Sequence, residues 1–505
     1  MQTYHEPLVK AWTDYVAGRI DAKTLKSHSA GFGIYQQRDG RTMMRIRRVG
    51  GFVTTRDLHV ICEILKAHPG AYAHLTTRRD VQLHGIPAEA VTATLETCER
   101  RGFPFRGGGG DTFRNVLTSV YSGLHPDSVF DVTPYAQALS EEFATFDRAY
   151  ALPRKLKIAF ADRPADAALA LTNDLGFIAK IVDGERVFET YLGGGIGFKP
   201  RLGFKLFDAL PAPDCVRAAR ALTALFDEHG CRTNRAHARI RFLRDDLGDA
   251  GFADLFKTYF DREPPVTNFR IDAQYPPAAV RIPFPASFPD VQTAAPDDWR
   301  ALAVTPLAHG LAAVRLFVPF GNFTVQELWR LLVLLEYHSV GRLEILPSLD
   351  LGIVVAACQL DGVYAVLDAF STNNRDYCAR SFVGNIRTCV GCTVCTSGVT
   401  DAPAIGRAVA DYFDARYAVR DTPEKIAVAR ALLNDVRISG CPNSCTCQQL
   451  AAFGFAGRKQ NGADAETVYT PGSLQPPRLG EPGEVIPAAD LPAVLERRIL
   501  ARVTG

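Results

Sequence analysis

The feature that most constrains the fold of this 505-residue chain is an internal repeat with an offset of about 270 positions. Three segments recur in the same order, which chance does not easily produce. In the first pair, Arg45-Ile-Arg47 followed by Gly50-Gly-Phe-Val-Thr matches Val314-Arg-Leu-Phe317 followed by Gly321-Asn-Phe-Thr. In the second, Phe113-Arg-Asn-Val116 matches Val383-Gly-Asn-Ile386. In the third, Arg201-Leu-Gly203 matches Arg478-Leu-Gly480. The repeat predicts two related halves about a pseudo-twofold axis, with a cleft between them that can hold a large cofactor.

Composition narrows the class of protein. The length suggests about three domains, and 47% hydrophobic and 22% charged residues are usual for a globular protein. A formal charge of only +2 gives no case for nucleic acid as a partner. The longest apolar run, residues 351–358, is too short for the roughly 20 residues of a membrane span. The first thirty residues are charged throughout, unlike a signal peptide, so we expect a cytoplasmic protein with no membrane partner.

The 12 cysteines are unevenly distributed. Six are scattered among apolar neighbours and are expected to be small buried hydrophobic residues. The other six form two groups that suggest metal ligation in a reducing compartment. The groups are Cys389, Cys392 and Cys395, and Cys441, Cys445 and Cys447.

Spacing alone leaves three ligand sets open. Cys389-x2-Cys392-x2-Cys395 with Cys441-Pro442 is similar to a ferredoxin cluster run. A second set omits Cys392 and combines Cys389-x5-Cys395 with Cys441-x3-Cys445. A zinc site is the third, although no histidine lies near either group.

The first half carries cations where the second carries cysteines. Arg78 and Arg114 lie near glycine- or threonine-rich turns, and Lys155 and Lys157 are two positions apart. On a strand, both lysines would point to one face. On spacing alone, two such lysines are expected at a solvated sheet edge more often than at an anion-binding site.

Taken together, these residues resemble the sirohaem-containing nitrite and sulfite reductase family. The resemblance extends from Gly33-Ile-Tyr-Gln-Gln-Arg38 to Arg478-Leu-Gly480, and its most specific motif is Gly440-Cys-Pro-Asn-Ser-Cys445. Its other motifs are Thr76-Thr-Arg78, Arg114-Asn115, Leu152-Pro-Arg-Lys155-Leu-Lys157, Gly193-Gly-Gly-Ile-Gly197 and Cys389-x5-Cys395. The internal duplication is also a property of that family.

The resemblance implies a [4Fe-4S] cluster held by Cys389, Cys395, Cys441 and Cys445, with Cys445 also the axial ligand of sirohaem. It implies that Arg78, Arg114, Lys155 and Lys157 surround the substrate anion. The further residues that it places at the cofactor are Asn443, Gln82, His84, Asn115, Gly194 and Gly195. We expect the glycine loop to use backbone N–H groups, and the additional thiols of Cys392 and Cys447 to be inert.

The resemblance also implies the organisation and the reaction. The fold class is α+β: each half has a ferredoxin-like α/β unit and a mixed α/β sirohaem/Fe-S domain, and together they form a three-lobed molecule. The predicted segments are an N-terminal extension (1–40), half-domain 1 (41–108), mixed domain 1 (109–270), a Pro-rich linker (271–305), half-domain 2 (306–375) and mixed domain 2 (376–505).

The expected reaction is the six-electron reduction of sulfite to sulfide, with nitrite reduction to ammonia as the alternative. Lys157 favours sulfite, because plant-type nitrite members have Asn at that place. No flavin or nicotinamide domain is recognisable, so ferredoxin or another one-electron carrier is the expected donor. The rival interpretations are a precorrin-3B synthase-like mono-oxygenase and a non-catalytic, cofactor-carrying electron-transfer subunit.

Overall fold

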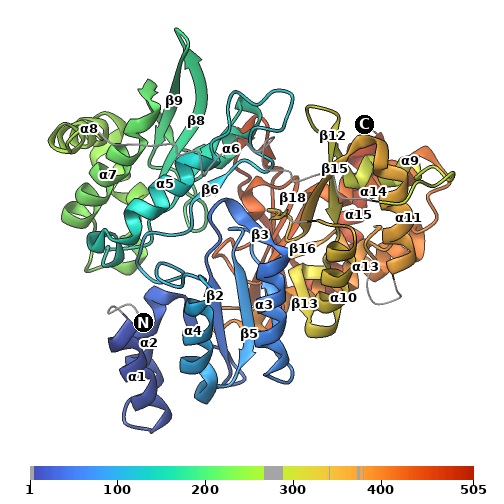
Figure 1. The fold of residues 1–505 in the computed structure, drawn as a ribbon, viewed down its shortest axis with the longest axis horizontal. Helices are drawn as coiled ribbons and strands as arrows, with labels where there is room; N and C mark the ends of the chain where they lie inside the picture. The colour runs from blue at the N-terminus through green and yellow to red at the C-terminus, as the bar shows by residue number, and fades with distance from the viewer. Residues whose placement is uncertain (1–4, 267–287, 341, 372–375, 379, 505) are drawn as a thin grey trace.

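The structure, a computed structural model, describes residues 5–266, 288–340, 342–371, 376–378 and 380–504. Three lobes are visible in Figure 1: one contains α7 and β9, one contains α3 and β5, and one contains α13 and α15. These helices are α3 (Thr55–Lys66), α7 (Cys215–His229), α13 (Ala402–Tyr417) and α15 (Leu491–Thr504). No helix in the described ranges is long and apolar enough to cross a membrane.

Two five-stranded sheets form the central lobe. Their strands are β1 (Ile34–Gln36), β2 (Thr42–Ile46), β3 (Phe52–Thr54), β4 (Tyr72–Leu75), β5 (Val81–Ile86), β11 (Val304–Pro306), β12 (Leu311–Leu316), β13 (Asn322–Thr324), β14 (Arg342–Ile345) and β15 (Leu351–Ala356). The strand orders are β1-β2-β5-β4-β13 and β11-β12-β15-β14-β3. Each half therefore lends one strand to the sheet of the other, since β13 pairs with β4 and β3 pairs with β14.

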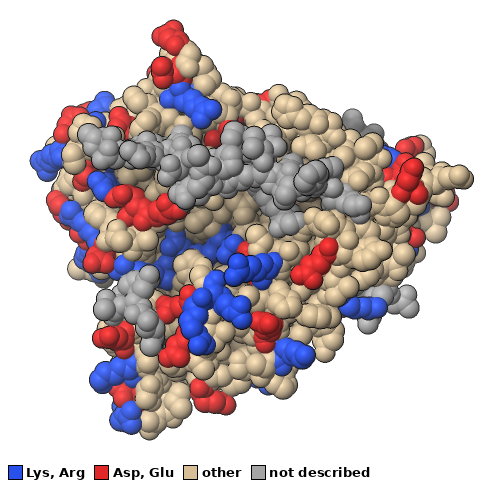
Figure 2. All heavy atoms as spheres, viewed as in Figure 1, with Lys and Arg blue, Asp and Glu red and all other residues tan. Residues whose placement is uncertain are grey.

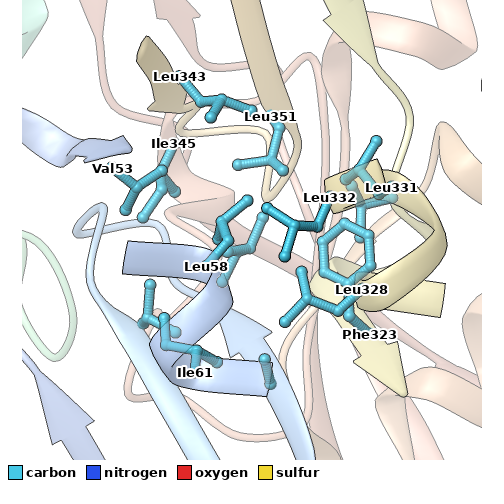
Figure 3. Packing of buried hydrophobic residues seen from close by; sticks show 14 of the residues in the cluster. Val53, Leu58, Ile61, Phe323, Leu328, Leu331, Leu332, Leu343, Ile345 and Leu351 are labelled. Carbon is cyan, nitrogen blue, oxygen red and sulfur yellow. The ribbon is translucent and has the colours of Figure 1, made fainter. Parts of the chain in front are cut away.

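The equivalent helices α3 and α10 (Val325–Tyr337) pack against each other over these sheets. Each begins with a capping box, in which the Thr54 or Thr324 side chain accepts from the backbone N–H three residues later. Figure 3 shows Leu58 of α3 beside Leu328 and Leu332 of α10. These residues belong to one buried hydrophobic core shared by both halves, so the halves are joined by core packing as well as by strand exchange.

Two further sheets belong to the mixed domains, and in each the first three strands are parallel and the last three antiparallel. The first contains β6 (Leu117–Thr118), β7 (Ile158–Ala161), β8 (Leu175–Val182), β9 (Glu185–Leu192) and β10 (Phe204–Pro211). The second contains β16 (Arg387–Thr388), β17 (Val436–Ser439), β18 (Phe453–Gln460), β19 (Ala463–Tyr469) and β22 (Pro482–Pro487).

The remaining elements lie around these sheets. They are α1 (Glu6–Val16), α2 (Ala22–Ser29), α4 (Val91–Arg100), α5 (Thr133–Ala144), α6 (Ala167–Leu171), α8 (Ile240–Arg262), α9 (Asp297–Ala303), α11 (Leu360–Phe370), α12 (Gly391–Val394), α14 (Pro423–Asp435), β20 (Ser473–Leu474) and β21 (Pro477–Arg478).

The repeat is confirmed element by element. Strands β1, β3, β4, β5 and β6 recur 270 positions later as β11, β13, β14, β15 and β16, and β7 and β8 recur 278 positions later as β17 and β18. Asn115 and Asn385 each stand two positions before the matching strand. The α+β fold class with two related halves is therefore confirmed.

Two local expectations need correction. Residues 271–287 of the predicted linker lie outside the described ranges, but residues 297–303 form α9 instead of continuing as extended chain. Asp297 and Asp298 favour the start of that helix, and Trp299 is buried against Tyr364 at 5.2 Å between ring centroids. Lys155 and Lys157 precede β7, which begins only at Ile158.

Candidate active site

The two cysteine groups meet at one edge of the second mixed sheet. Cys389 directly follows β16, and Cys441 comes two residues after β17, whose Ile438 is paired with Thr388. Because β16 and β17 are parallel neighbours, their carboxyl ends lie together. The backbone N–H of Gly440 donates to the Cys389 Sγ at 3.1 Å, so the sheet register brings distant parts of the sequence into contact.

Four thiols converge at this edge. Cys389, Cys395, Cys441 and Cys445 each interact electrostatically with the other three. Burial, followed by the neighbouring thiols, raises the pKa of Cys445 to about 12. The residue still has accessible surface, so it remains open to a ligand.

The other two cysteines of the motifs stand apart. Cys392 is not among the groups that shift the pKa values of Cys389, Cys441 and Cys445. Cys447 instead interacts electrostatically with Arg78 and Lys157. Within the described residues, no group of three or more His, Cys, Asp or Glu side chains could hold a single metal ion.

The first half supplies a group of buried and half-buried cations opposite these thiols. Lys155 interacts electrostatically with Cys445 and with Lys157, Arg239 and Arg114. Burial lowers the pKa of Lys157 to about 7, with Arg78 and Arg239 as the next causes. Burial also lowers the pKa of Arg78 to about 10 and that of Arg114 to about 9. Desolvation of so many neighbouring cations is costly unless an anion compensates it.

Sequence reasoning missed part of this cation group. Arg239 and Arg241, at the start of α8, belong to it; Arg239 Nη2 donates to Asp174 at 2.9 Å. Ala238-Arg-Ile-Arg241 alternates apolar and basic residues just as Lys155-Leu-Lys157 does, a signal that could have identified it. In the space-filling view of Figure 2, Lys and Arg side chains gather near the middle of the face.

Several guanidinium groups of both halves have buried N–H groups without a hydrogen-bond partner in the described structure. They are Arg47 Nε and Nη2, Arg78 Nε, Arg239 Nε, Arg241 Nε and Nη1, Arg387 Nε and Arg437 Nε. Buried donors are normally satisfied, and guanidinium groups suit carboxylates. The arrangement therefore fits a cofactor that carries many carboxylates, and sirohaem is such a cofactor.

Direct contacts tie the cation half to the thiol half. The Thr77 hydroxyl donates to the Cys445 carbonyl at 2.7 Å. Arg38 donates to the carbonyls of Cys395 at 3.2 Å and Gly398 at 3.0 Å. The Gln449 amide donates to the Gly197 carbonyl at 3.3 Å. Both cysteine loops are thus held by the first half, so the site is formed between the two copies.

The remaining predicted site residues have more local roles. The Asn115 amide donates to the Arg48 and Arg78 carbonyls at 2.9 and 3.1 Å, which positions the Arg78 backbone. Gln82 lies 3.0 Å from His84 Nε2 in the first sheet. His84 also stacks on Tyr72 with ring centroids 4.8 Å apart, so its ring packs among residues of its own half.

The glycine loop requires one correction. The Gly195 N–H already donates to the Arg201 carbonyl at 2.8 Å and is not free for a cofactor. A Cβ at Gly194 would lie 2.1 Å from the Leu171 carbonyl oxygen, and one at Gly195 would lie 2.9 Å from Arg241 Nη1. Close packing against backbone atoms therefore explains Gly194, whereas at Gly195 only the end of the flexible Arg241 side chain would have to move. Asn443 is exposed in the cysteine loop, and its carbonyl oxygen lies 3.6 Å from a Cβ built at Gly197.

Four thiols that can hold a cluster thus face a group of cations between the two halves. This arrangement is typical of an iron–sulfur oxidoreductase that acts on a small anion. Comparison with known families agrees. Residues 35–100 match the nitrite/sulfite reductase ferredoxin-like half domain, and residues 109–263 match the nitrite and sulphite reductase 4Fe-4S domain. The second match covers the copy with the cations, so it does not itself assign the cysteine ligands.

Full-length relatives are similar to the chain over most of its length. The ferredoxin–nitrite reductase of Synechococcus elongatus is 26% identical over 92% of this chain and 86% of the relative. The sulfite reductase [ferredoxin] of Mycobacterium tuberculosis is 26% identical over 87% and 77%. The solved structure of the M. tuberculosis NirA protein shares the fold, with a TM-score of 0.77 and 22% identity over 99% of this chain and 94% of that one. The chain thus carries two domains of nitrite and sulfite reductases and is similar to such enzymes over most of its length, which supports a [4Fe-4S] cluster and sirohaem as its cofactors.

Proposed function

We propose that the chain reduces sulfite to sulfide in six one-electron steps, with ferredoxin or a similar carrier as donor in the cytoplasm. The observation that carries the proposal is the position of Lys155 and Lys157, which lie together among buried arginines in the recess faced by Cys445. Sulfite is partly dianionic near neutrality, so it gains more from two adjacent ammonium groups than nitrite does.

Each residue has a distinct proposed role. Cys389, Cys395, Cys441 and Cys445 hold the cluster, and Arg47, Arg239, Arg241 and Arg437 bind cofactor carboxylates through their unpaired N–H groups. When bound, the cluster and sirohaem supply the electron path and the iron centre.

Arg78, Arg114, Lys155 and Lys157 bind and orient the substrate anion. Lys157 can also deliver protons. With a pKa of about 7 it exchanges protons readily near neutral pH. A bound anion raises the pKa of the ammonium group again, so substrate binding and proton uptake are linked. Arginine cannot take this role, because it stays charged.

Nitrite reduction to ammonia is the second candidate. It is supported by the ferredoxin–nitrite reductases among the relatives and uses the same residues. Both reactions consume protons and release substrate oxygen as water, so the anion site alone sets the preference.

The test is Lys157→Asn with both substrates and an artificial one-electron donor. We expect sulfite turnover to fall about 10²–10³-fold and nitrite turnover to fall much less, because one transition-state contact to the dianion is lost. An unchanged visible spectrum should show that the cofactors are retained. Lys257→Asn, an exposed lysine on α8, is the matched control. Equal losses on both anions would mean that Lys157 does not set the preference, and the sulfite proposal would fail.

A further inference from the structure

Two adjacent buried polar residues, Asn173 and Asp174, lie beside the cation group in the turn between α6 and β8. The Asn173 side-chain oxygen accepts a hydrogen bond from Arg78 Nη1 at 3.1 Å. Its amide nitrogen donates to the Leu169 carbonyl at 2.7 Å. Because this second bond fixes the orientation of the amide, the oxygen is held toward the Arg78 guanidinium.

Asp174 contacts two further members of the cation group. Its Oδ2 accepts from the Lys157 backbone N–H at 2.8 Å. Arg239 Nη2 donates to Oδ1 at 2.9 Å and to Oδ2 at 3.1 Å. The backbone N–H of Asp174 in turn donates to the Lys157 carbonyl at 3.0 Å. The turn therefore fixes Arg78, Lys157 and Arg239 relative to one another, although they come from distant parts of the sequence.

The internal repeat provides a comparison for this turn. Strands β7 and β8 recur 278 positions later as β17 and β18, so the equivalents of Asn173 and Asp174 are Ala451 and Ala452. These alanines stand directly before β18, as the polar pair stands directly before β8. Folding of a mixed domain therefore does not require polar side chains at this turn. A buried carboxylate is costly to desolvate, so its presence in the copy with the cations indicates a role in the site.

We propose that Asn173 and Asp174 are positioning residues of the anion site, which hold its cations in place and keep Lys157 charged for the incoming anion. The inference rests on the proposed function, because it takes Lys157 as a substrate contact. The groups that act electrostatically on Lys157 are Arg78, Arg239, Cys447, Asp174 and the neighbouring Lys155. Asp174 is the carboxylate among them, and its charge favours the protonated form of Lys157 against the two guanidinium groups.

Removal of this charge has an effect of known direction. Burial, followed by Arg78 and Arg239, already lowers the pKa of Lys157 to about 7. Asp174→Asn keeps an oxygen for the Lys157 N–H but removes the negative charge, so the pKa of Lys157 should fall further. The alkaline limb of kcat/KM should then move about one pH unit to lower pH. At pH 8 this makes kcat/KM about tenfold lower than in the wild type, whereas near pH 5 the two enzymes should differ little.

The pH profile of kcat/KM, measured on the holoenzyme with an artificial one-electron donor, tests the role of Asp174. Asp174→Glu restores the charge and should return the alkaline limb to the wild-type position, although its longer side chain lowers the rate at every pH. Asp254→Asn removes an exposed carboxylate on α8 and is the matched control. A merely structural role would lower the rate equally at every pH, so an Asp174→Asn profile that keeps the wild-type limb would overturn the inference.

Asn173 is tested by a change that leaves the charge of the site as it is. Asn173→Ala removes the acceptor of Arg78 and should raise KM for the anion about tenfold, because a hydrogen bond to a charged group is lost. The alkaline limb should stay where it is in the wild type. An unchanged KM would show that Asn173 does not position Arg78 for the anion.

Proton uptake on anion binding gives a readout that does not depend on turnover. Nitrite does not itself titrate near neutral pH, so calorimetry of nitrite binding to the oxidised holoenzyme, in buffers of different ionisation enthalpy, reports the protons taken up by the protein. At pH 6 the wild type should take up about 0.1 proton, because Lys157 is already mostly charged, and Asp174→Asn about half a proton. Equal uptake by these two proteins would contradict the inference.

Lys157→Asn separates failure of the inference from failure of the proposed function. If this variant keeps the wild-type uptake and pH profile, Lys157 is not the titrating substrate contact and the proposed function fails with the inference. If Lys157→Asn abolishes the uptake while Asp174→Asn behaves like the wild type, the proposed role of Lys157 stands and only the role of Asp174 is wrong.

Discussion

Glu466 on β19 gives a quantitative prediction about pH and stability. None of its side chain is exposed; Oε1 accepts from the Thr400 hydroxyl at 3.1 Å, and Oε2 has no hydrogen-bond partner in the described structure. Burial raises the pKa of this carboxyl from 4.5 to about 8. The folded protein therefore holds a proton on Glu466 that the unfolded chain releases near pH 4.5.

The direction and size of the change in stability with pH follow from the linkage between protonation and folding. Below pH 4.5 both states are protonated, and the stability contributed by protonated Glu466 is fully present. Between pH 4.5 and about 8 it is lost as pH rises, by about 1.4 kcal/mol per pH unit, because the unfolded state binds fewer protons. Over the whole window the loss is on the order of 4–5 kcal/mol. Glu466→Gln keeps an acceptor for Thr400 and removes the titration.

The assay is urea unfolding followed by circular dichroism at about pH 5 and pH 9. We compare the free energy of unfolding of Glu466→Gln with that of the wild type. The difference in favour of the variant should be several kcal/mol larger at pH 9 than at pH 5. Exposed Glu484 on the neighbouring strand β22 is the control, and Glu484→Gln should show no such difference. A Glu466→Gln effect of equal size at both pH values would refute a neutral buried carboxyl.

Two further predictions concern the cluster and the junction of the halves. Replacing Cys389, Cys395, Cys441 or Cys445 by serine should abolish retention of iron and acid-labile sulfide. The variants Cys392→Ala and Cys447→Ala should retain both. Loss of iron and sulfide in Cys392→Ala would favour the ferredoxin-like ligand set instead. Glu344→Gln should destabilise the protein by about 3–5 kcal/mol in urea unfolding, because Arg79 keeps its buried charge after losing the partner 2.8 Å away. Exposed Glu89→Gln should change little, and a similarly small effect at Glu344 would show that this ion pair does not hold the halves together.

Sequence reasoning reached the fold class because duplication leaves a pattern that can be read along the chain. It could not reveal the strand exchange of β3 and β13, since strand pairing between halves has no local signal. It grouped the cysteines correctly as motifs, but spacing left the ligand set open. The register of β16 against β17 is what places Cys389 beside Gly440. Arg239 and Arg241 were missed because they lie far along the chain from the cations they join.

Duplication also explains why the chemistry is confined to one place. The repeat gives each of these site residues an equivalent position in the other copy. Lys157 precedes β7, and its equivalent Asp435 precedes β17. Cys389 and Cys441 follow β16 and β17, and their equivalents Ser119 and Arg163 follow β6 and β7.

The equivalent positions therefore carry a carboxylate where the anion site has an ammonium group, and they carry neither of the two matching thiols. A cysteine introduced at residue 119 or 163 would not by itself assemble a second cluster, because Cys395 and Cys445 would still lack counterparts there. One copy of the fold supplies cations and the other supplies thiols. Keeping the two groups on separate copies lets the charges meet only across the recess, where a cofactor and an anion can lie between them.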